Sequence, residues 1–375
     1  HIPGSKWEIP AKRRYLSGVP RSLVPMGTHM DRLTYFIRRL VLVIPTFLII
    51  TMLCYGIVHL VPGGPVEQTI RAMRGMGGGG ESGPLAAAGD GVSEKQRQEI
   101  RKYYEFDKPL PVRYWHWLVR DRVGMRKKSF QYKKPAWEVI RSRLPVSIIF
   151  GLTGFMLSYL VCIPLGIVKA LRHGGPFDVM SSIVVFVGYS IPAFAFGMVL
   201  KMLLCGTVEG MWDFFPVGGF QSDNFDTLPF LSKVKDITVH MCLPVACYVA
   251  SSFAVLTLMM KNSLLDQIGA DYVRTVYAKG GSSARAIWGH ALRNAMIPIA
   301  TGFGRIFTVM FAGSVIIERL FDIPGMGQLG LDAIINRDYG VFMCVMALTS
   351  VLALLGNVLS DFCYVMIDPR IDFER

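Results

Sequence analysis

Residues 144–168 read LPVSIIFGLTGFMLSYLVCIPLGIV, an apolar run without a single Asp, Glu, Lys or Arg. A helix needs about 20 apolar residues to cross a hydrocarbon core of about 30 Å. That core offers a peptide group no hydrogen-bond partner, so a single apolar segment crosses it as a helix, whose backbone groups bond to one another. This stretch therefore predicts a transmembrane helix.

Five further segments have the length and composition of membrane spans. Hydrophobic residues make up 52% of the chain and charged residues only 18%, and the charges gather between the apolar runs, which argues against a soluble globular domain. The predicted fold is an all-α integral membrane protein with six transmembrane helices. Besides 144–168, the predicted spans are 40–61, 179–200, 237–260, 295–317 and 341–367.

The loops between the predicted spans alternate in charge. Basic residues precede the first span and follow the second and the fourth, whereas the loops after the third and the fifth are acidic. Short loops rich in Lys and Arg face the cytoplasm. The pattern predicts a membrane protein with both termini in the cytoplasm. The basic residues concerned are Arg32, Arg38, Arg39, Lys169, Arg172, Lys261, Arg274, Lys279, Arg285 and Arg293.

This topology divides the chain into four parts. Residues 1–29 lack apolar periodicity and are expected to be a tag or upstream sequence, and 30–61 form the N-terminal segment and the first span. Residues 62–143 form a large extracytoplasmic insertion, and 144–375 form a core of five helices. The insertion holds 17 Lys or Arg against 9 Asp or Glu. Its net charge of +8 on the outer side is compatible with the topology, because the positive-inside rule applies to short loops.

The motifs of common nucleotide-binding and catalytic sites are absent from the sequence. It contains no Gly-x-x-x-x-Gly-Lys-Ser/Thr, no His-Glu-x-x-His and no Gly-x-Ser-x-Gly, and its seven cysteines form no Cys-x-x-Cys pair. We therefore expect a chain that is not an enzyme, with no catalytic residue, metal or cofactor of its own. The formal net charge is +13, but the basic residues flank the membrane segments and do not form one dense stripe on a soluble domain. Nucleic acid is therefore not an expected partner.

The loop between the fourth and fifth spans, residues 262–294, reads NSLLDQIGADYVRTVYAKGGSSARAIWGHALRN. Apolar residues recur every four positions from Leu264 to Val276, which predicts a short helix. Gly280 or Gly281 can take a left-handed conformation at its end. Ser282 or Ser283 can then cap a second helix. The loop is predicted to be a helical hairpin with one apolar face.

This loop resembles the coupling-loop signature of dipeptide and oligopeptide ABC importer permeases. The resemblance rests on Asp271-Tyr-Val-Arg-Thr followed by Ala278-Lys279-Gly280, and on His290-Ala-Leu-Arg-Asn294. It extends along nearly the whole chain after Met30. Further matching motifs are Arg38-Arg39 with Pro45, Pro62-Gly-Gly-Pro65, Phe106-Asp-Lys-Pro109, Leu144-Pro-Val-Ser147, Tyr189-Ser-Ile-Pro-Ala-Phe194, Pro324-Gly-Met-Gly327 and Asp368-Pro-Arg370.

Within the family, the chain is most similar to the B-type permease of the microcin C and oligopeptide importer. The similarity lies in Pro62-Gly-Gly-Pro-Val-Glu67, the large insertion and the tail that begins at Asp368. The family's loop motif often begins Glu-Ala-Ala, where this chain has Asp271-Tyr-Val as in the peptide branch.

The resemblance implies a location in the bacterial inner membrane, a function and a set of partners. The chain would be a non-catalytic permease whose loop docks on a cytoplasmic ATPase, with ATP and Mg²⁺ bound by the ATPase subunits. It would pair with a second homologous permease and act with two ATPase subunits and an extracytoplasmic peptide-binding protein. The residues that the resemblance assigns to ATPase coupling are Asp271, Tyr272, Arg274, Ala278, Lys279, Gly280, His290 and Asn294.

Two charged residues inside predicted spans are candidates for the transport pathway. Arg305 lies in the middle of the fifth span, where it could contact a peptide carboxylate or pair with Asp361 of the sixth. Lys201, near the outer end of the third span, is expected to extend its ammonium group to the lipid headgroups.

Prolines inside spans are expected to kink them or end them. Those in the predicted spans of the core include Pro164, Pro192, Pro244 and Pro298.

The alternative function is an ion-coupled secondary transporter, which needs ion-binding groups at broken helices near the midplane and has no docking loop for an ATPase.

Overall fold

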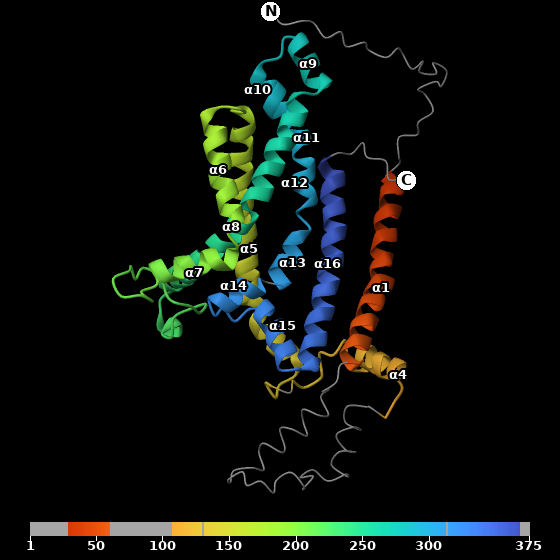
Figure 1. Ribbon diagram of the computed structural model, residues 1–375. Coiled ribbons are helices and arrows are strands. Elements are labelled where there is room, and N and C mark those ends of the chain that lie inside the picture. Colours follow the sequence, from red (N-terminus) through yellow and green to blue (C-terminus); the bar gives the residue numbers. More distant parts are fainter. Residues whose placement is uncertain (1–28, 61–106, 130, 313, 368–375) are drawn as a thin grey trace, which may run out of the picture.

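The computed structural model describes residues 29–60, 107–129, 131–312 and 314–367, and these ranges are helical apart from connecting loops and two isolated bridges (Figure 1). The predicted all-α class is confirmed for this part of the chain. Most of the N-terminal segment 1–29, and the outer insertion up to residue 106, lie outside the described residues.

Four helices are long and apolar enough to cross a bilayer without a break. They are α1 (His29–Leu60), α5 (Ala136–Leu171), α8 (Phe230–Ile268) and α16 (Tyr339–Ile367), and they match the first, second, fourth and sixth predicted spans. At a rise of about 1.5 Å per residue, the 39 residues of α8 extend well beyond a hydrocarbon core of about 30 Å. Its end therefore projects from the bundle.

The third predicted span, 179–200, is broken at Pro192, as expected of a proline inside a span. The chain forms α6 (Pro176–Ser190) and α7 (Ala193–Leu204), which meet at 95°. Pro192 lies at the break, where Ile191 has an extended ψ of 120°. A residue before proline is driven out of the α region by the proline ring, which explains why α6 ends there.

The fifth predicted span, 295–317, is also broken. Its helices are α12 (Ile297–Thr301), α13 (Arg305–Ala312) and α14 (Val315–Leu320), and the chain bends by 44° between 283–301 and 306–320. Pro298 lies in the first turn of α12, where a missing N–H costs nothing. By contrast, Pro164 and Pro244 lie within α5 and α8, which continue through them.

The break before α13 is stabilised by α16. The Ser360 hydroxyl donates to the Thr301 carbonyl at 2.8 Å and accepts the Gly304 N–H at 3.0 Å. A Cβ on Gly304 would lie 1.8 Å from the Gly356 carbonyl oxygen, so the two backbones touch. Backbone groups released by the break thus find partners inside the bundle, as the lipid phase requires.

The helices form a bundle with α5 and α8 at its centre, while α1 lies at one edge against α16 (Figure 1). The start of α1, the end of α16 and the α5–α6 turn lie at the same end of the bundle as the loop after α8. We call this the hairpin end. The opposite end, called the collar end, carries α4 (Leu110–Trp115), α14 and α15 (Met326–Ile335).

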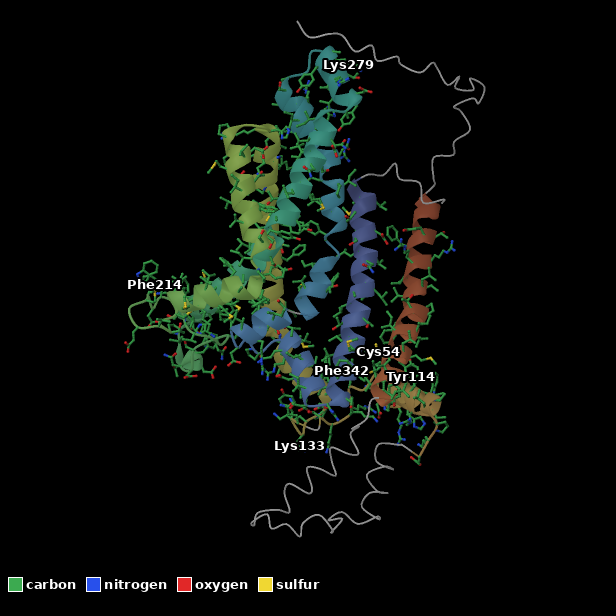
Figure 2. All side chains as sticks on the ribbon, in the orientation of Figure 1. Cys54, Tyr114, Lys133, Phe214, Lys279 and Phe342 are labelled. Atoms are coloured by element: carbon green, nitrogen blue, oxygen red, sulfur yellow. The ribbon has the colours of Figure 1, made fainter. Side chains whose placement is uncertain are left out.

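The collar end is fixed to the spans by buried groups. Trp117, in the π-helical turn His116–Arg120 after α4, packs with Tyr55 of α1 and Met343 of α16. Figure 2 shows Tyr114 and Cys54 in the same region. Asp338, 3% exposed, accepts hydrogen bonds from Ser129, from the Gln131 N–H at 3.2 Å and from the Val341 N–H at 3.3 Å.

The Pro324-Gly-Met-Gly327 motif holds a buried carboxylate at the start of α15. Glu318 of α14 is fully buried, and its Oε2 accepts the Gln328 N–H at 2.8 Å. A Cβ on Gly325 would lie 2.5 Å from the carboxyl carbon of Glu318. Glycine at 325 is therefore required for the carboxylate to reach the positive end of the helix.

Gly304→Ala is expected to lower the free energy of unfolding by about 1–3 kcal/mol, because a methyl group has no space against the backbone of Gly356. The measurement is thermal unfolding in detergent, followed by tryptophan fluorescence. Gly188→Ala in α6 is the matched control, since a Cβ there meets nothing within 4 Å. Equal midpoints for the two variants would contradict the packing described.

Candidate functional site

The loop after α8 is a helical hairpin, as predicted. Its first arm is α9 (Asp271–Ala278). Its second arm runs through α10 (Ser283–Ala286), a π-helical turn (Ile287–Ala291) and α11 (Leu292–Ala295). Lys279 lies in the turn between the arms, at the end of the molecule farthest from the collar (Figure 2). We call residues 271–295 the coupling hairpin.

Two glycines close the first arm, each for a different reason. Gly280 has a φ of +79° and donates its N–H to the Tyr277 carbonyl at 2.9 Å, while the Gly281 N–H reaches the Val276 carbonyl at 3.0 Å. This pair of bonds is the Schellman motif, with Gly280 in the left-handed position. Gly281 needs to be small instead, because a Cβ there would lie 2.6 Å from the Val276 side chain.

The second arm begins at Ser282. Its hydroxyl accepts the Arg285 N–H at 3.3 Å and so satisfies one of the free N–H groups at the start of α10. The sequence left two candidates for the left-handed position and two for the cap. The structure selects Gly280 and Ser282, with one residue between them.

The inner face of the coupling hairpin is apolar and fully buried. Val273, Ala286 and Ala291 have no exposed surface and belong to the same cluster as Met260 and Leu264 of α8. Three small alanines on the second arm, the third being Ala295, let the helices approach closely. Cys162, Ile167 and Ala170 of α5 complete the cluster. The coupling hairpin is therefore packed onto the ends of α5 and α8 and is not a loose connection.

The outer face carries the residues assigned to ATPase coupling. Seven of them are exposed, and Asn294 is half-buried. Asp271 and Arg274 approach to 3.4 Å on the surface, and the Tyr272 hydroxyl donates to Gln267 at 2.8 Å. The structure thus brings the predicted residues to the solvent side of one rigid element. The exposed residues are Asp271, Tyr272, Arg274, Ala278, Lys279, Gly280 and His290.

Two exposed aromatic residues on the hairpin were missed by the sequence analysis. Tyr277 is 43% exposed and Trp288 is 57% exposed. The sequence gives no signal for the exposure of Trp288, because a tryptophan beside Ile287 and near Ala291 fits the apolar face of the second helix. Its exposure in the folded chain gives the outer face an aromatic component.

The sequence of the chain matches a known family over more than half of its length. The profile of the binding-protein-dependent transport system inner membrane component covers residues 162–373. The chain belongs to this family. The coupling hairpin lies inside the matched region. The resemblance to dipeptide and oligopeptide ABC importer permeases is confirmed.

Several relatives match this permease from end to end. It is 40% identical over 364 residues to the inner membrane ABC transporter permease protein YejB of Escherichia coli O157:H7, an alignment that covers 91% of this chain and 99% of that protein. It is 37% identical over 364 residues to the peptidoglycan transport system permease protein YejB of Agrobacterium fabrum, with 91% and 98% covered. It is 32% identical over 359 residues to the dipeptide transport system permease protein DppB of Escherichia coli K12, with 92% and 100% covered.

One of the two pathway candidates of the permease, Asp361 of α16, forms an ion pair with Arg39 of α1 at 2.7 Å. The backbone of Arg305 lies at the start of α13, next to the break, and its side chain is outside the described part of the structure. The contact of Arg305 with a peptide carboxylate and its pairing with Asp361 both stay predictions.

Lys201 makes a contact within the protein that the sequence analysis did not predict. Its ammonium group donates to the Leu320 carbonyl at 2.9 Å and lies 5.9 Å from the centre of the Phe321 ring. The last carbonyls of a helix lack partners within it, and Lys201 supplies one to the end of α14. It thereby ties the two broken spans together.

Gly280→Val is expected to weaken docking of the ATPase, because a β-branched residue in the left-handed region costs about 1–2 kcal/mol and shifts the turn. The measurement is recovery of ATPase subunits with the affinity-purified permease, together with ATP-dependent uptake. Gly280→Asn is the control of similar size that tolerates a positive φ. Unchanged recovery and uptake for the valine variant would refute a docking role for this turn.

Proposed function

We propose that this permease is one half of a pseudo-symmetric pair in an ATP-driven, binding-protein-dependent importer of oligopeptides. The observation that carries the proposal is the coupling hairpin, which is exposed on one face and packed into the ends of α5 and α8 on the other. Membership of the transport family and full-length similarity to permeases named for dipeptide and oligopeptide transport support it.

The mechanism assigns the chemistry to partner subunits. Two cytoplasmic ATPase subunits bind ATP and Mg²⁺, and their closure displaces the docked coupling hairpin. Since Val273, Met260 and Leu264 share one close-packed cluster, the ends of α5 and α8 move with the hairpin. ATP binding thereby favours one of two states of the permease, open to the inside or to the outside.

The orientation follows from where the charges gather. Arg38, Arg39, Lys169, Arg172 and Lys261 all belong to segments at the hairpin end (Figure 1). Under the positive-inside rule this end faces the cytoplasm of the bacterial inner membrane. The start of α1 and the end of α16 lie at the same end, so both termini are cytoplasmic in the proposed topology.

The collar end is the proposed docking surface for the peptide-binding protein. Residues 62–106 contain six basic and six acidic residues, whereas 107–143 contain eleven basic against three acidic. The whole excess of +8 therefore lies in residues 107–143, and Lys133 projects there from the end of the bundle (Figure 2). A surface of this charge is complementary to an acidic face on a soluble protein.

Replacing Arg126, Lys128 and Lys134 together by Glu is expected to raise, by at least tenfold, the concentration of binding protein that gives half-maximal uptake. All three side chains are exposed, so their charges act on an approaching partner. The control exchanges Lys and Arg at the same positions and keeps the charge. An unchanged concentration dependence would exclude the collar as the docking surface.

The substrate range is proposed from the names of relatives. They include permeases for dipeptides, di- and tripeptides, oligopeptides and peptidoglycan. Peptides are the shared chemistry, and uptake of microcin C-like peptides stays a prediction. Competition by such peptides against labelled oligopeptide uptake is the measurement that decides it.

The alternative of an ion-coupled secondary transporter is favoured by one observation, the two broken spans. Discontinuous helices form the ion sites of many secondary transporters. In this permease, however, the break before α13 is occupied by protein contacts, because Ser360 and Gly356 fill it. The coupling hairpin has no role in that alternative.

The test is peptide uptake into proteoliposomes that contain this permease, its copurified partners and internal ATP, with and without external binding protein. We expect uptake only when both ATP and the binding protein are present. Uptake by this chain alone under an ion gradient would overturn the proposal in favour of the secondary transporter.

A further inference from the structure

Three charged side chains are buried together at the hairpin end, and the function described so far does not use them. Lys169 of α5 has no exposed surface, Asp178 of α6 is 4% exposed, and Lys261 of α8 is largely covered. The sequence analysis treated both lysines as topology signals. Their ammonium groups also turn inward and hold the Asp178 carboxylate between three helices. We call these three residues the ionic joint.

The contacts of the ionic joint are numerous and directional. Lys261 Nζ lies 2.7 and 2.8 Å from the two carboxylate oxygens of Asp178. Lys169 Nζ lies 3.2 Å from one of them and also donates to the Asp178 carbonyl at 3.0 Å. The α5–α6 turn adds the Gly174 N–H at 3.1 Å and the His173 ring at 3.3 Å. Lys169 also donates to Ser181 at 2.7 Å and to Ser182 at 2.8 Å.

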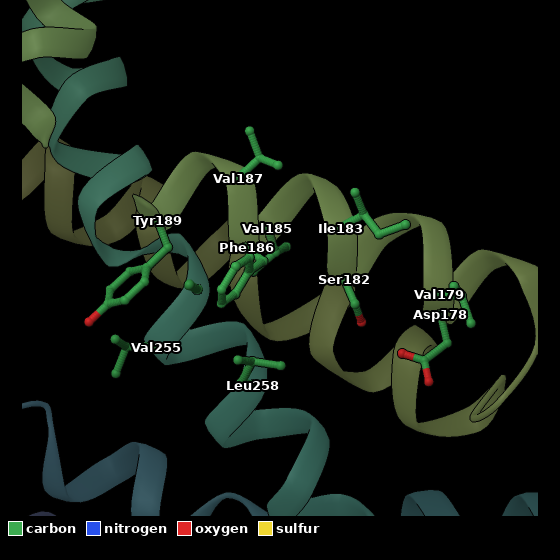
Figure 3. Close-up of a pocket in the computed structure, with 11 residues that line it drawn as sticks. Asp178, Val179, Ser182, Ile183, Val185, Phe186, Val187, Tyr189, Val255 and Leu258 are labelled. Carbon is green, nitrogen blue, oxygen red and sulfur yellow. The ribbon is translucent and has the colours of Figure 1, made fainter. Parts of the chain in front are cut away.

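Few side chains of α6 are buried against the bundle apart from the ionic joint. Within α6, Asp178 and Val185 are the buried residues, while apolar side chains such as Val184 and Phe186 are 64% and 70% exposed. An open pocket of about 730 Å³ separates α6 from α8 between Asp178 and Tyr189 (Figure 3). The sparse contact leaves α6 room to pivot against α8.

The ionic joint lies between the coupling hairpin and the broken span. Lys261 is three residues before Leu264, which is fully buried in the cluster that holds the hairpin. At its other end α6 stops at the 95° break before Pro192. A displacement of the end of α8 therefore reaches the start of α6 directly, and the break lets α6 turn without carrying α7 along.

We propose that Asp178 is a positioning residue for transport, and that with Lys169 and Lys261 it transmits movement of the coupling hairpin to α6. The inference rests on the proposed importer function. Charges suit this role because a buried ion pair holds one geometry, whereas apolar contacts along α6 are few. Asp178→Asn leaves two buried lysines without their carboxylate, so α6 no longer follows α8.

The experiment uses the whole transporter in proteoliposomes and measures ATP hydrolysis and peptide uptake in the same sample. For Asp178→Asn we expect normal assembly, ATP hydrolysis within twofold of wild type, and at least a tenfold fall in peptide transported per ATP. The charge swap Asp178→Lys with Lys261→Asp keeps the total charge. We expect it to transport at least three times as much peptide per ATP as Asp178→Asn. Asp226→Asn, an exposed acid in the loop before α8, is the control for the substitution itself.

The outcomes separate the ionic joint from a purely structural role. If hydrolysis and uptake fall in proportion, or if assembly is lost and the swap does not restore it, the joint only stabilises the fold and the inference is wrong. Unchanged transport per ATP in Asp178→Asn also overturns it. If the wild-type complex itself shows no ATP-driven uptake, the proposed function fails, and the transmission role falls with it.

Discussion

A bilayer interior accepts a peptide group only when its N–H and C=O are already bonded, and the architecture of this permease follows from that constraint. Four spans meet it as unbroken helices. The third and fifth predicted spans are interrupted. Ser360 of α16 supplies partners at the break before α13, and Lys201 of α7 donates to the Leu320 carbonyl at the end of α14. The broken spans are thus stabilised by helices distant in sequence.

The two faces of the coupling hairpin differ in composition and in what they contact. Its inner face is made of Val273 and small alanines that interlock with α8, and close-packed interiors deform little. Its outer face is charged and aromatic, which is the composition of a surface that binds another protein. The Gly280 turn sets the angle between the two arms and therefore the shape of the outer face.

Local chemistry in the sequence was enough to predict the unbroken spans and the hairpin. The run 144–168 has no alternative to a helix in lipid, and Gly280-Gly281-Ser282-Ser283 admits only a helix end followed by a helix start. What remained open depends on contacts between distant residues. Pro192 predicted a kink or an end of its span but not the angle of 95°. The close approach of Gly304 needs Gly356, and the burial of Lys169 needs Asp178 to lie across from it. Residue types identify such positions only after the helices are placed.

The hydrogen bonds of Asp338 have a consequence for how the two sides of the membrane communicate. They fasten Ser129 and Gln131 of the collar end to the first turn of α16, and the same helix carries Gly356 and Ser360 against the break before α13. A force on the collar end would therefore reach the break before α13 through α16. In the proposed importer, closure of the ATPase subunits would act on the bundle from the hairpin end through α8. Docking of the binding protein and closure of the ATPase would then both act on the same interior helices.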